Sequence, residues 1–252
     1  MEIVILTALG VGGATVIGAI FGFIFKNISH KFSDIVLSFA AGVMLAAAVI
    51  GLVLPALEGS SAINFVVVLV GIFTGAVFLN LLDKFIPHLH KLAGAPEEHH
   101  PEQTERINKI LLFVLAIAIH NLPEGIAAGV GVGGENVVDG LTVAGGIALQ
   151  NVPEGMVIIG PMLAAGMSKS RTFVCALMTG VIEVLGTFIG FFAVNISQAL
   201  LPFALAFAGG TMLYVISDEM IPETHAHGSE RGATFALLIG FSVMLATDFF
   251  LN

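Results

Sequence analysis

The stretch INKILLFVLAIAIHNLPEGIAAGVG, residues 107–131, decides the fold, because it is a long apolar run with a cluster of polar residues at its centre. Its length exceeds the roughly 20 residues that a helix needs to cross a bilayer. Seven further runs of similar length and character occupy most of the remaining chain. The eight expected spans are residues 3–25, 33–57, 63–86, 107–131, 138–165, 172–194, 199–221 and 233–250.

The composition points to lipid as the surrounding solvent. Hydrophobic residues make up 57% of the chain and charged residues only 11%, with a mean hydropathy of +1.01, whereas soluble domains carry about 25% charged residues. Only helices and closed barrels satisfy their backbone in lipid, and these runs are too long for barrel strands. The sequence therefore predicts an all-α membrane protein, a single domain of residues 1–252 built as a bundle of eight transmembrane helices.

The basic residues predict the orientation of this bundle. Lys and Arg collect in cytoplasmic loops, and here they fall in or beside alternate loops only. We therefore expect a multi-pass protein of the plasma or inner cell membrane, with both termini outside. The first basic residue follows the first apolar run, which favours a retained span over a signal peptide. The nine residues are Lys26, Lys31, Lys84, Lys91, Arg106, Lys109, Lys169, Arg171 and Arg231.

The segment PHLHKLAGAPEEHHPEQTER, residues 87–106, is expected to be a histidine-rich cytoplasmic loop. Its prolines and polarity are typical of a solvated linker. Its four histidines also make it a candidate for loose metal binding. Both interpretations stay open on the sequence.

Three glutamates lie near the centres of expected spans: Glu124, Glu154 and Glu183. An ionised carboxylate at the bilayer centre costs about 3 kcal/mol, so intramembrane acids indicate function by default. No Lys or Arg lies near the centre of a span to neutralise them. We therefore expect either protons or a cation among these carboxylates.

Two polar motifs repeat one pattern at the centres of neighbouring spans. The first is HNLPEG (residues 120–125) and the second is QNVPEG (residues 150–155). Residues three and four apart share a helix face, so the polar residues that open each motif lie on one face with its glutamate. Because consecutive spans run antiparallel, we expect the two faces to meet around a pseudo-two-fold axis. The side chains are His120, Asn121, Glu124, Gln150, Asn151 and Glu154.

A proline precedes the glutamate of each motif. Pro123 and Pro153 have no N–H to donate to the carbonyl groups of Ile119 and Leu149, four residues earlier. Free carbonyl oxygens and helix kinks are therefore expected beside the carboxylates. A lone proline kink or a lone amide is more often structural in a membrane helix. The recurrence of N-x-P-E-G in two neighbouring spans nevertheless favours a functional site.

Oxygen ligands with one imidazole suit a divalent metal such as zinc, and also iron, manganese or cadmium. Three carboxylates carry a charge of −3, so one divalent ion leaves about −1 and two leave about +1. Either state is better balanced than the empty, fully ionised cluster. An empty cluster is expected to share protons, which would couple metal release to proton uptake.

The paired motifs, the eight expected spans and the histidine-containing loop resemble the ZIP metal-ion transporters, in particular their GufA-like bacterial branch. The resemblance covers the whole chain. It implies a ZIP-like fold, a homodimer, and a motion of spans 1, 4, 5 and 6 against the other four. It also implies a two-metal transport site at mid-membrane, where Met44, by default a gap filler, contributes a thioether. The implied metal residues are His120, Asn121, Glu124, Gln150, Asn151, Glu154, Glu183 and Met44.

Two positions depart from the pattern of the family. Its second motif commonly begins with His and often continues with Asp, whereas this chain has Gln150 and Asn151. Both are neutral and weaker ligands. These residues are expected to decide how tightly a second metal is held and how selective the site is for zinc.

The expected function is secondary transport of divalent transition-metal ions into the cytoplasm, with zinc foremost and cadmium, iron and manganese as further candidates. The expected partners are the metal ion, the lipid bilayer and a second copy of the chain, with no organic cofactor and no nucleic acid. An intramembrane zinc-dependent hydrolase is the alternative from another class, but its H-E-x-x-H pattern does not occur. A passive cation channel is the alternative among transport proteins.

The cytoplasmic exit is expected where the third and seventh spans end. A cation that moves inward needs sites weak enough to leave, and acidic or imidazole groups at the mouth would supply them. Ordinary helix-end polarity is the plain alternative. The candidates are Asp83, His88, Asp218 and Glu219.

Overall fold

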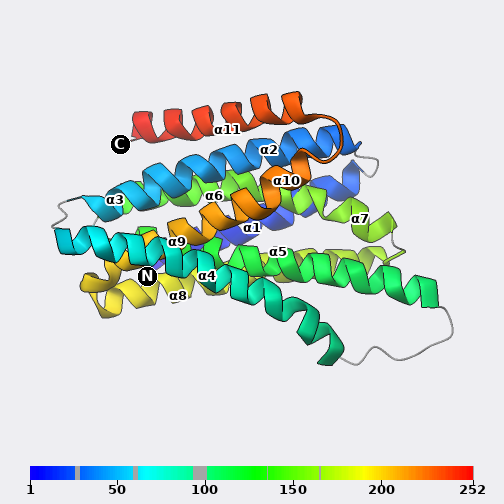
Figure 1. Cartoon of the computed structure of the whole chain (residues 1–252), viewed down its shortest axis with the longest axis horizontal. Helices are drawn as coiled ribbons and strands as arrows, with labels where there is room; N and C mark the ends of the chain where they lie inside the picture. Colours follow the sequence, from blue (N-terminus) through cyan, green and yellow to red (C-terminus); the bar gives the residue numbers. More distant parts are fainter. Residues whose placement is uncertain (26–28, 59–61, 93–100, 135, 165, 252) are drawn as a thin grey trace.

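A computed structural model of the chain describes residues 1–25, 29–58, 62–92, 101–134, 136–164 and 166–251. The regular elements in these ranges are all helical, which confirms the predicted class, and they form an elongated bundle (Figure 1). The elements are α1 (Glu2–Ile24), α2 (His30–Ala46), the π-helical segment η1 (Ala47–Val53), α3 (Leu54–Leu57), α4 (Ala62–Leu92), α5 (Pro101–Gly133), α6 (Val137–Val157), α7 (Ile159–Ala164), α8 (Lys169–Ile196), the 3-10 turn η2 (Gln198–Leu200), α9 (Leu201–Val215), the π-helical segment η3 (Ile216–Met220), α10 (Ile221–Thr224) and α11 (Glu230–Leu251).

Seven stretches of the described residues are helical, long and apolar enough to cross a membrane. They coincide with seven of the eight expected spans, and the chain is accordingly a multi-pass membrane protein. The remaining expected span, residues 107–131, lies within the 33 residues of α5, which is not one of the seven. The seven stretches are Glu2–Ile24, His30–Leu57, Ala62–Leu82, Val137–Ala164, Lys169–Ile196, Leu201–Thr224 and Glu230–Leu251.

The segment 87–106 is more helical than the loop expected there. Helix α4 continues to Leu92, and α5 already begins at Pro101. Residues 93–100, which include two of the four histidines, lie outside the described residues. The expectation was too long at both ends because polar residues continue a helix readily once it leaves the apolar region.

Glycines bring the helices that carry the motifs into backbone contact with their neighbours. A Cβ atom at Gly125 of α5 would lie 2.2 Å from the carbonyl oxygen of Glu183 on α8. A Cβ atom at Gly155 of α6 would lie 2.2 Å from the carbonyl oxygen of Thr15 on α1. The last residue of each motif is therefore a contact point between helices. This confirms the role of small residues in close helix approach.

The same type of contact joins the other helices. Gly42 of α2 lies against the backbone of Leu237 on α11, and Gly75 of α4 lies against the backbone of Phe207 on α9. Helices α1, α5, α6 and α8 form one packed group. Contacts of α2 with α6 and of α9 with α5 join this group to the other helices. The motifs on α5 and α6 thus lie inside the bundle.

The surface of the bundle is apolar and its interior holds polar groups. Large hydrophobic side chains such as Phe73, Phe235 and Phe249 are largely exposed, whereas Glu124, Gln150 and Glu183 are almost completely buried. Lipid would solvate the former but not the latter. This distribution is the one expected of a membrane protein with a polar site in its core.

Two π-helical segments, η1 and η3, interrupt the helical runs that contain α2 and α9. Each ends before a proline, Pro55 after η1 and Pro222 after η3. In each segment a backbone N–H donates to the carbonyl oxygen five residues earlier. Leu54 N–H donates to Val49, and Ile221 N–H donates to Ile216. Proline cannot donate the bond that would close a regular turn, and π-bulges are frequent at functional sites.

The connections of the bundle gather at its two ends. Both chain ends lie toward one end, and the connections between α1 and α2, α7 and α8, and α10 and α11 lie at the opposite end (Figure 1). Lys31, Lys169 and Arg231 sit beside these three connections, each within the first two residues of its helix. The basic residues of those helices are therefore grouped at one end of the molecule.

Candidate functional site

The candidate site lies where α1, α5, α6 and α8 meet. Helix α5 carries HNLPEG and α6 carries QNVPEG, and each helix continues through the proline of its motif. Glu183 faces them from α8 and Thr15 from α1. Glu183 has no exposed surface, and Glu124 and Asn151 are each 1% exposed. The structure therefore brings the two motifs and the third glutamate together, as expected.

Glu183 is held by hydrogen bonds from three helices. The Thr15 hydroxyl of α1 donates to Oε1 at 2.7 Å, and the amide Nδ2 of Asn151 on α6 donates to Oε2 at 2.7 Å. The amide Nδ2 of Asn121 on α5 also donates to Oε1. A buried carboxylate is tolerable when such donors replace water. Both oxygens of Glu183 are thus engaged.

A further hydrogen bond joins the two motifs directly. Gln150 Nε2 donates to Glu124 Oε1 at 2.8 Å. The bond links equivalent faces of α5 and α6, as the pseudo-symmetric arrangement predicts. It also shows what Gln150 does where the family commonly has a histidine: its amide N–H groups face a carboxylate, and its oxygen stays available.

Among the residues that the structure describes, no hydrogen-bond donor reaches four buried oxygens of the motifs. Such groups are rare, because leaving a buried acceptor unpaired costs about 1–3 kcal/mol. All four belong to carboxylate or amide groups, which are the ligands of choice for cations of hard to borderline character. The atoms are Glu124 Oε2, Gln150 Oε1, Asn121 Oδ1 and Asn151 Oδ1.

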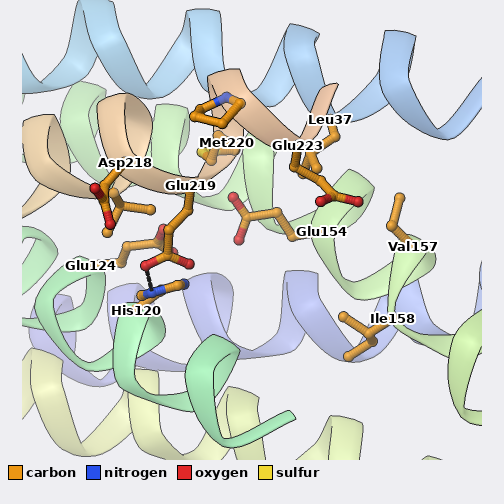
Figure 2. A pocket seen from close by; sticks show the side chains of 12 residues that line it. Leu37, His120, Glu124, Glu154, Val157, Ile158, Asp218, Glu219, Met220 and Glu223 are labelled. Carbon is orange, nitrogen blue, oxygen red and sulfur yellow. Dashed lines mark ion pairs between the residues drawn. The ribbon is translucent and has the colours of Figure 1, made fainter. Parts of the chain in front are cut away.

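A cavity of about 460 Å³ adjoins the motifs. Figure 2 shows Glu124 and Glu154 on one side of it and Asp218, Glu219 and Glu223 along the other. The second set comes from η3 and α10. The cavity thus extends from the motifs toward the end of the bundle where α10 joins α11. Five carboxylates line it, which favours cations over anions.

His120 is in contact with the other wall of this cavity. Its Nε2 lies 2.6 Å from Oε1 of Glu219, the contact drawn as a dashed line in Figure 2. Glu219 belongs to the π-helical segment η3, so this pair connects α5 with the helices that do not carry a motif. Glu219 was expected near the exit, and the structure places it directly on the site.

The remaining predicted residues are distributed as follows. Asp218 lines the cavity beside Glu219. Met44 is 1% exposed in the apolar core of α2 and is not one of the cavity-lining residues. Asp83 and His88 belong to α4, but their side chains lie outside the described part of the chain. Their proposed role at the exit stays a prediction.

The carboxylates do not yet surround a common point. Within the described residues, no three His, Cys, Asp or Glu side chains are grouped closely enough to hold a metal ion. Amide hydrogens instead occupy positions next to Glu124 and Glu183. A cation bound here must therefore use amide oxygens as well as carboxylates, or must draw Glu154 and His120 inward.

Two residues of the candidate site were not predicted from the sequence. Thr15 lies in an apolar span without a motif, and a hydroxyl in a membrane helix commonly bonds its own backbone, so no local pattern distinguishes it. Glu223 lines the cavity but is not among the exit candidates predicted from the sequence. The proline before it, Pro222, was the available signal, because it repeats the proline–glutamate pair of both motifs.

Known proteins resemble this chain over most of its length. Residues 87–248 match the family described as ZIP Zinc transporter. The zinc transporter GufA of Myxococcus xanthus is 40% identical over 97% of both chains. The zinc transporter ZIPB of Bordetella bronchiseptica is 36% identical over 93% of this chain and 77% of its own length. The human zinc transporter ZIP11 is 32% identical over 94% of this chain and 93% of its own.

These matches extend across both motifs, α8 and the cavity wall formed by η3 and α10. They also cover nearly the full length of the chain. The protein therefore belongs to the ZIP zinc transporter family, as a GufA-like member.

Proposed function

We propose that this protein is a secondary transporter that carries divalent transition-metal ions, zinc foremost, across the membrane into the cytoplasm. The observation that carries the proposal is the set of four buried motif oxygens for which the described residues supply no donor, one of which, Glu124 Oε2, belongs to a residue that lines the acidic cavity. Buried acceptor oxygens without donors can be stabilised by a bound cation. A cation that passes through the site would supply this interaction while it is bound. Family membership makes the protein a transporter and not an enzyme.

Zinc is the preferred candidate for two reasons. Relatives from bacteria to human are named zinc transporters. The imidazole of His120 also favours a borderline metal over the hard ions magnesium and calcium. Cadmium, iron and manganese remain further cargoes, because amide and carboxylate oxygens discriminate weakly among divalent metals.

The metal is held in the first instance by His120, Glu124, Gln150 and Glu154. Three of these residues line the cavity, and Gln150 is bonded to Glu124. Asn121, Asn151 and Glu183 bound the site on the side of α8, where the resemblance implies a second metal. Met44 lies in α2, which packs against α6, and a shift of these helices would be needed to bring its thioether to the cargo.

The path to the cytoplasm leads through the cavity. Glu219 is already in contact with His120, and Asp218 and Glu223 continue the acidic wall. A metal that leaves Glu124 can therefore pass to Glu219 with little loss of ligation. Asp83 and His88 would follow at the end of the path.

The arrangement in the membrane follows from the same proposal. The eighth crossing is formed by α5, both termini lie outside, and the cavity opens to the cytoplasm of a plasma or inner cell membrane. The grouping of basic residues at the end opposite both chain ends supports this orientation. The functional unit is a homodimer, for which the exposed apolar face of α4 offers contact area.

Uptake into liposomes tests the proposal. Zinc, cadmium, iron and manganese are supplied outside vesicles that contain the purified protein, and the metal inside is measured with time. Glu124→Gln and Glu154→Ala should abolish uptake of every ion, because each removes a carboxylate of the site. Glu2→Gln, a carboxylate at the start of α1 outside the site, should leave uptake unchanged.

Two results would contradict the proposal or redirect it. Wild-type uptake rates in the Glu124→Gln protein would show that the motifs do not form the transport site. Unitary currents in a planar bilayer, without saturation by substrate, would identify the passive channel instead.

A further inference from the structure

The orientation of the Asn151 side chain is fixed by two acceptors. Its Nδ2 donates to Glu183 Oε2 at 2.7 Å and to the carbonyl oxygen of Val11 at 3.3 Å. A rotated amide would place its oxygen against a carboxylate and a carbonyl, both of which repel it. Asn151 must therefore present N–H groups to α1 and α8, and its Oδ1 faces elsewhere without a donor.

Asn121 is bound in the same manner. Its Nδ2 donates to Glu183 Oε1, and its Oδ1 is likewise a buried oxygen without a donor. The two asparagines thus share one carboxylate, which determines the direction of both amides. A single acidic residue on α8 orients an amide on α5 and another on α6.

Thr15 completes the coordination of Glu183. Its hydroxyl, on a residue that is 1% exposed, donates to the same Oε1 at 2.7 Å. Glu183 therefore receives three donors from three helices and has no surface exposed. A metal ion that binds this carboxylate would have to compete with these three donors, which take three of its roughly four lone-pair sites.

We propose that in this chain Glu183 does not bind the cargo but positions the asparagines of both motifs, and that the transport site consequently holds one metal ion. Thr15 and Asn151 are the positioning residues that keep Glu183 engaged. The inference rests on the proposed function and deepens it. It assigns the cause to Asn151, which replaces the aspartate that often occurs here in the family.

The physical reason is the charge of the side chain at position 151, which is neutral in asparagine and negative in an ionised aspartate. An amide donates a hydrogen bond to Glu183, which replaces part of the lost hydration of the carboxylate and adds no second negative charge. An aspartate could not donate, and two adjacent buried carboxylates would repel each other unless a cation lay between them. The amide nitrogen of Asn151, in place of a carboxylate oxygen of aspartate, therefore disfavours binding of a second metal ion beside Glu183.

The number of zinc ions bound per chain tests the inference. Full-length protein in detergent is equilibrated with zinc, and the bound metal is counted by elemental analysis. The reference is Glu124→Ala combined with Glu154→Ala, so that zinc on the histidine-rich segment cancels in the difference. We expect a difference of one ion per chain for the wild type, and of two when Asn151→Asp is introduced into the wild type and compared with the same unchanged reference.

The outcomes are distinguishable. A difference of two in the wild type would overturn the inference while leaving the transport site intact. A difference of one in both the wild type and the Asn151→Asp protein would overturn the assigned role of Asn151. No difference at all would contradict the proposed function itself.

Thr15 is tested by a pair of substitutions. Thr15→Val preserves the shape but removes the donor, and it should weaken zinc binding and raise the KM of uptake roughly tenfold, with the maximal rate little changed. Thr15→Ser restores the hydroxyl and should restore both values. Equal KM values for Val, Ser and wild type, at equal melting temperatures, would show that the hydroxyl does not position the site.

Discussion

We expect Gln150 to be the residue that decides the metal selectivity of this protein. It lies at the first position of the second motif, the position equivalent to His120 in the first, and its amide Nε2 donates to Glu124. Its oxygen is buried without a donor. The site therefore offers one imidazole where two would occur with a histidine at this position, and oxygen ligands hold hard cations relatively better.

Gln150→His should change that preference. A second imidazole favours zinc over manganese, so the ratio of zinc to manganese uptake in liposomes should rise about tenfold, as one ligand exchange of this type is worth on the order of 1.4 kcal/mol. Gln150→Asn keeps the amide chemistry and is the matched control. An unchanged ratio in the histidine variant would show that selectivity is decided elsewhere.

At the residue scale, the sequence predicted which polar side chains gather inside the bundle but not how they are paired. The two motifs and Glu183 were identified because carboxylates are costly inside a membrane. The contact of His120 with Glu219 and the hydrogen bond of Thr15 to Glu183 were not predicted. Both join residues far apart in the sequence, and spacing along one helix carries no information about them.

At the scale of helices, glycine contacts determine how closely the motifs approach α1 and α8. Helix α6 contains a direct comparison. A Cβ atom at Gly155 would meet the Thr15 carbonyl oxygen at 2.2 Å, whereas one at Gly145 would meet nothing within 4 Å. The two positions lie on the same helix, so helix propensity is the same for both.

Gly155→Ala should therefore destabilise the protein, and Gly145→Ala should not. Overpacking against backbone costs about 1–3 kcal/mol, because neither carbonyl nor helix can move without losing other contacts. Thermal unfolding in detergent, followed by fluorescence of a thiol-reactive dye, measures the difference. Equal melting temperatures for the two variants would mean that α1 and α6 can separate freely at this point.

The helices themselves were predicted closely, and their irregularities were not. Apolar length identified seven spans within a few residues, because transfer into lipid depends on composition over a whole window. The π-helical segments η1 and η3 escaped detection. Each depends on one proline and on packing that stabilises a hydrogen bond to the carbonyl five residues earlier. The prolines alone indicate a kink but not which backbone hydrogen bonds form around it.

At the scale of the whole molecule, the bundle separates two ends of opposite character. One holds the two chain ends, and the other holds the basic residues that begin α2, α8 and α11. Under the proposed inward transport, a cation that left the motifs would be attracted by the carboxylates of η3 and α10 that line the cavity.

A matched pair of cysteine substitutions tests this orientation. Glu2 and Glu230 are exposed acidic residues at the first positions of α1 and α11, at opposite ends of the bundle. In a Cys175→Ser background, Glu2→Cys should react with a membrane-impermeant maleimide on intact cells, and Glu230→Cys only after permeabilisation. The reverse labelling pattern would show that the chain ends face the cytoplasm. It would contradict the proposed orientation and favour export of the same cargo.

The sequence by itself determined that this chain crosses a membrane many times and carries a polar site built from two copies of one motif. Those properties follow from solvation and helical periodicity, which act over a few turns of one helix. Only the tertiary structure decided that Asn151 donates to Glu183, that Thr15 supports it and that His120 meets Glu219. Such pairings depend on how each helix is rotated about its axis and shifted along it when the helices pack. Close backbone contacts between helices determine that arrangement.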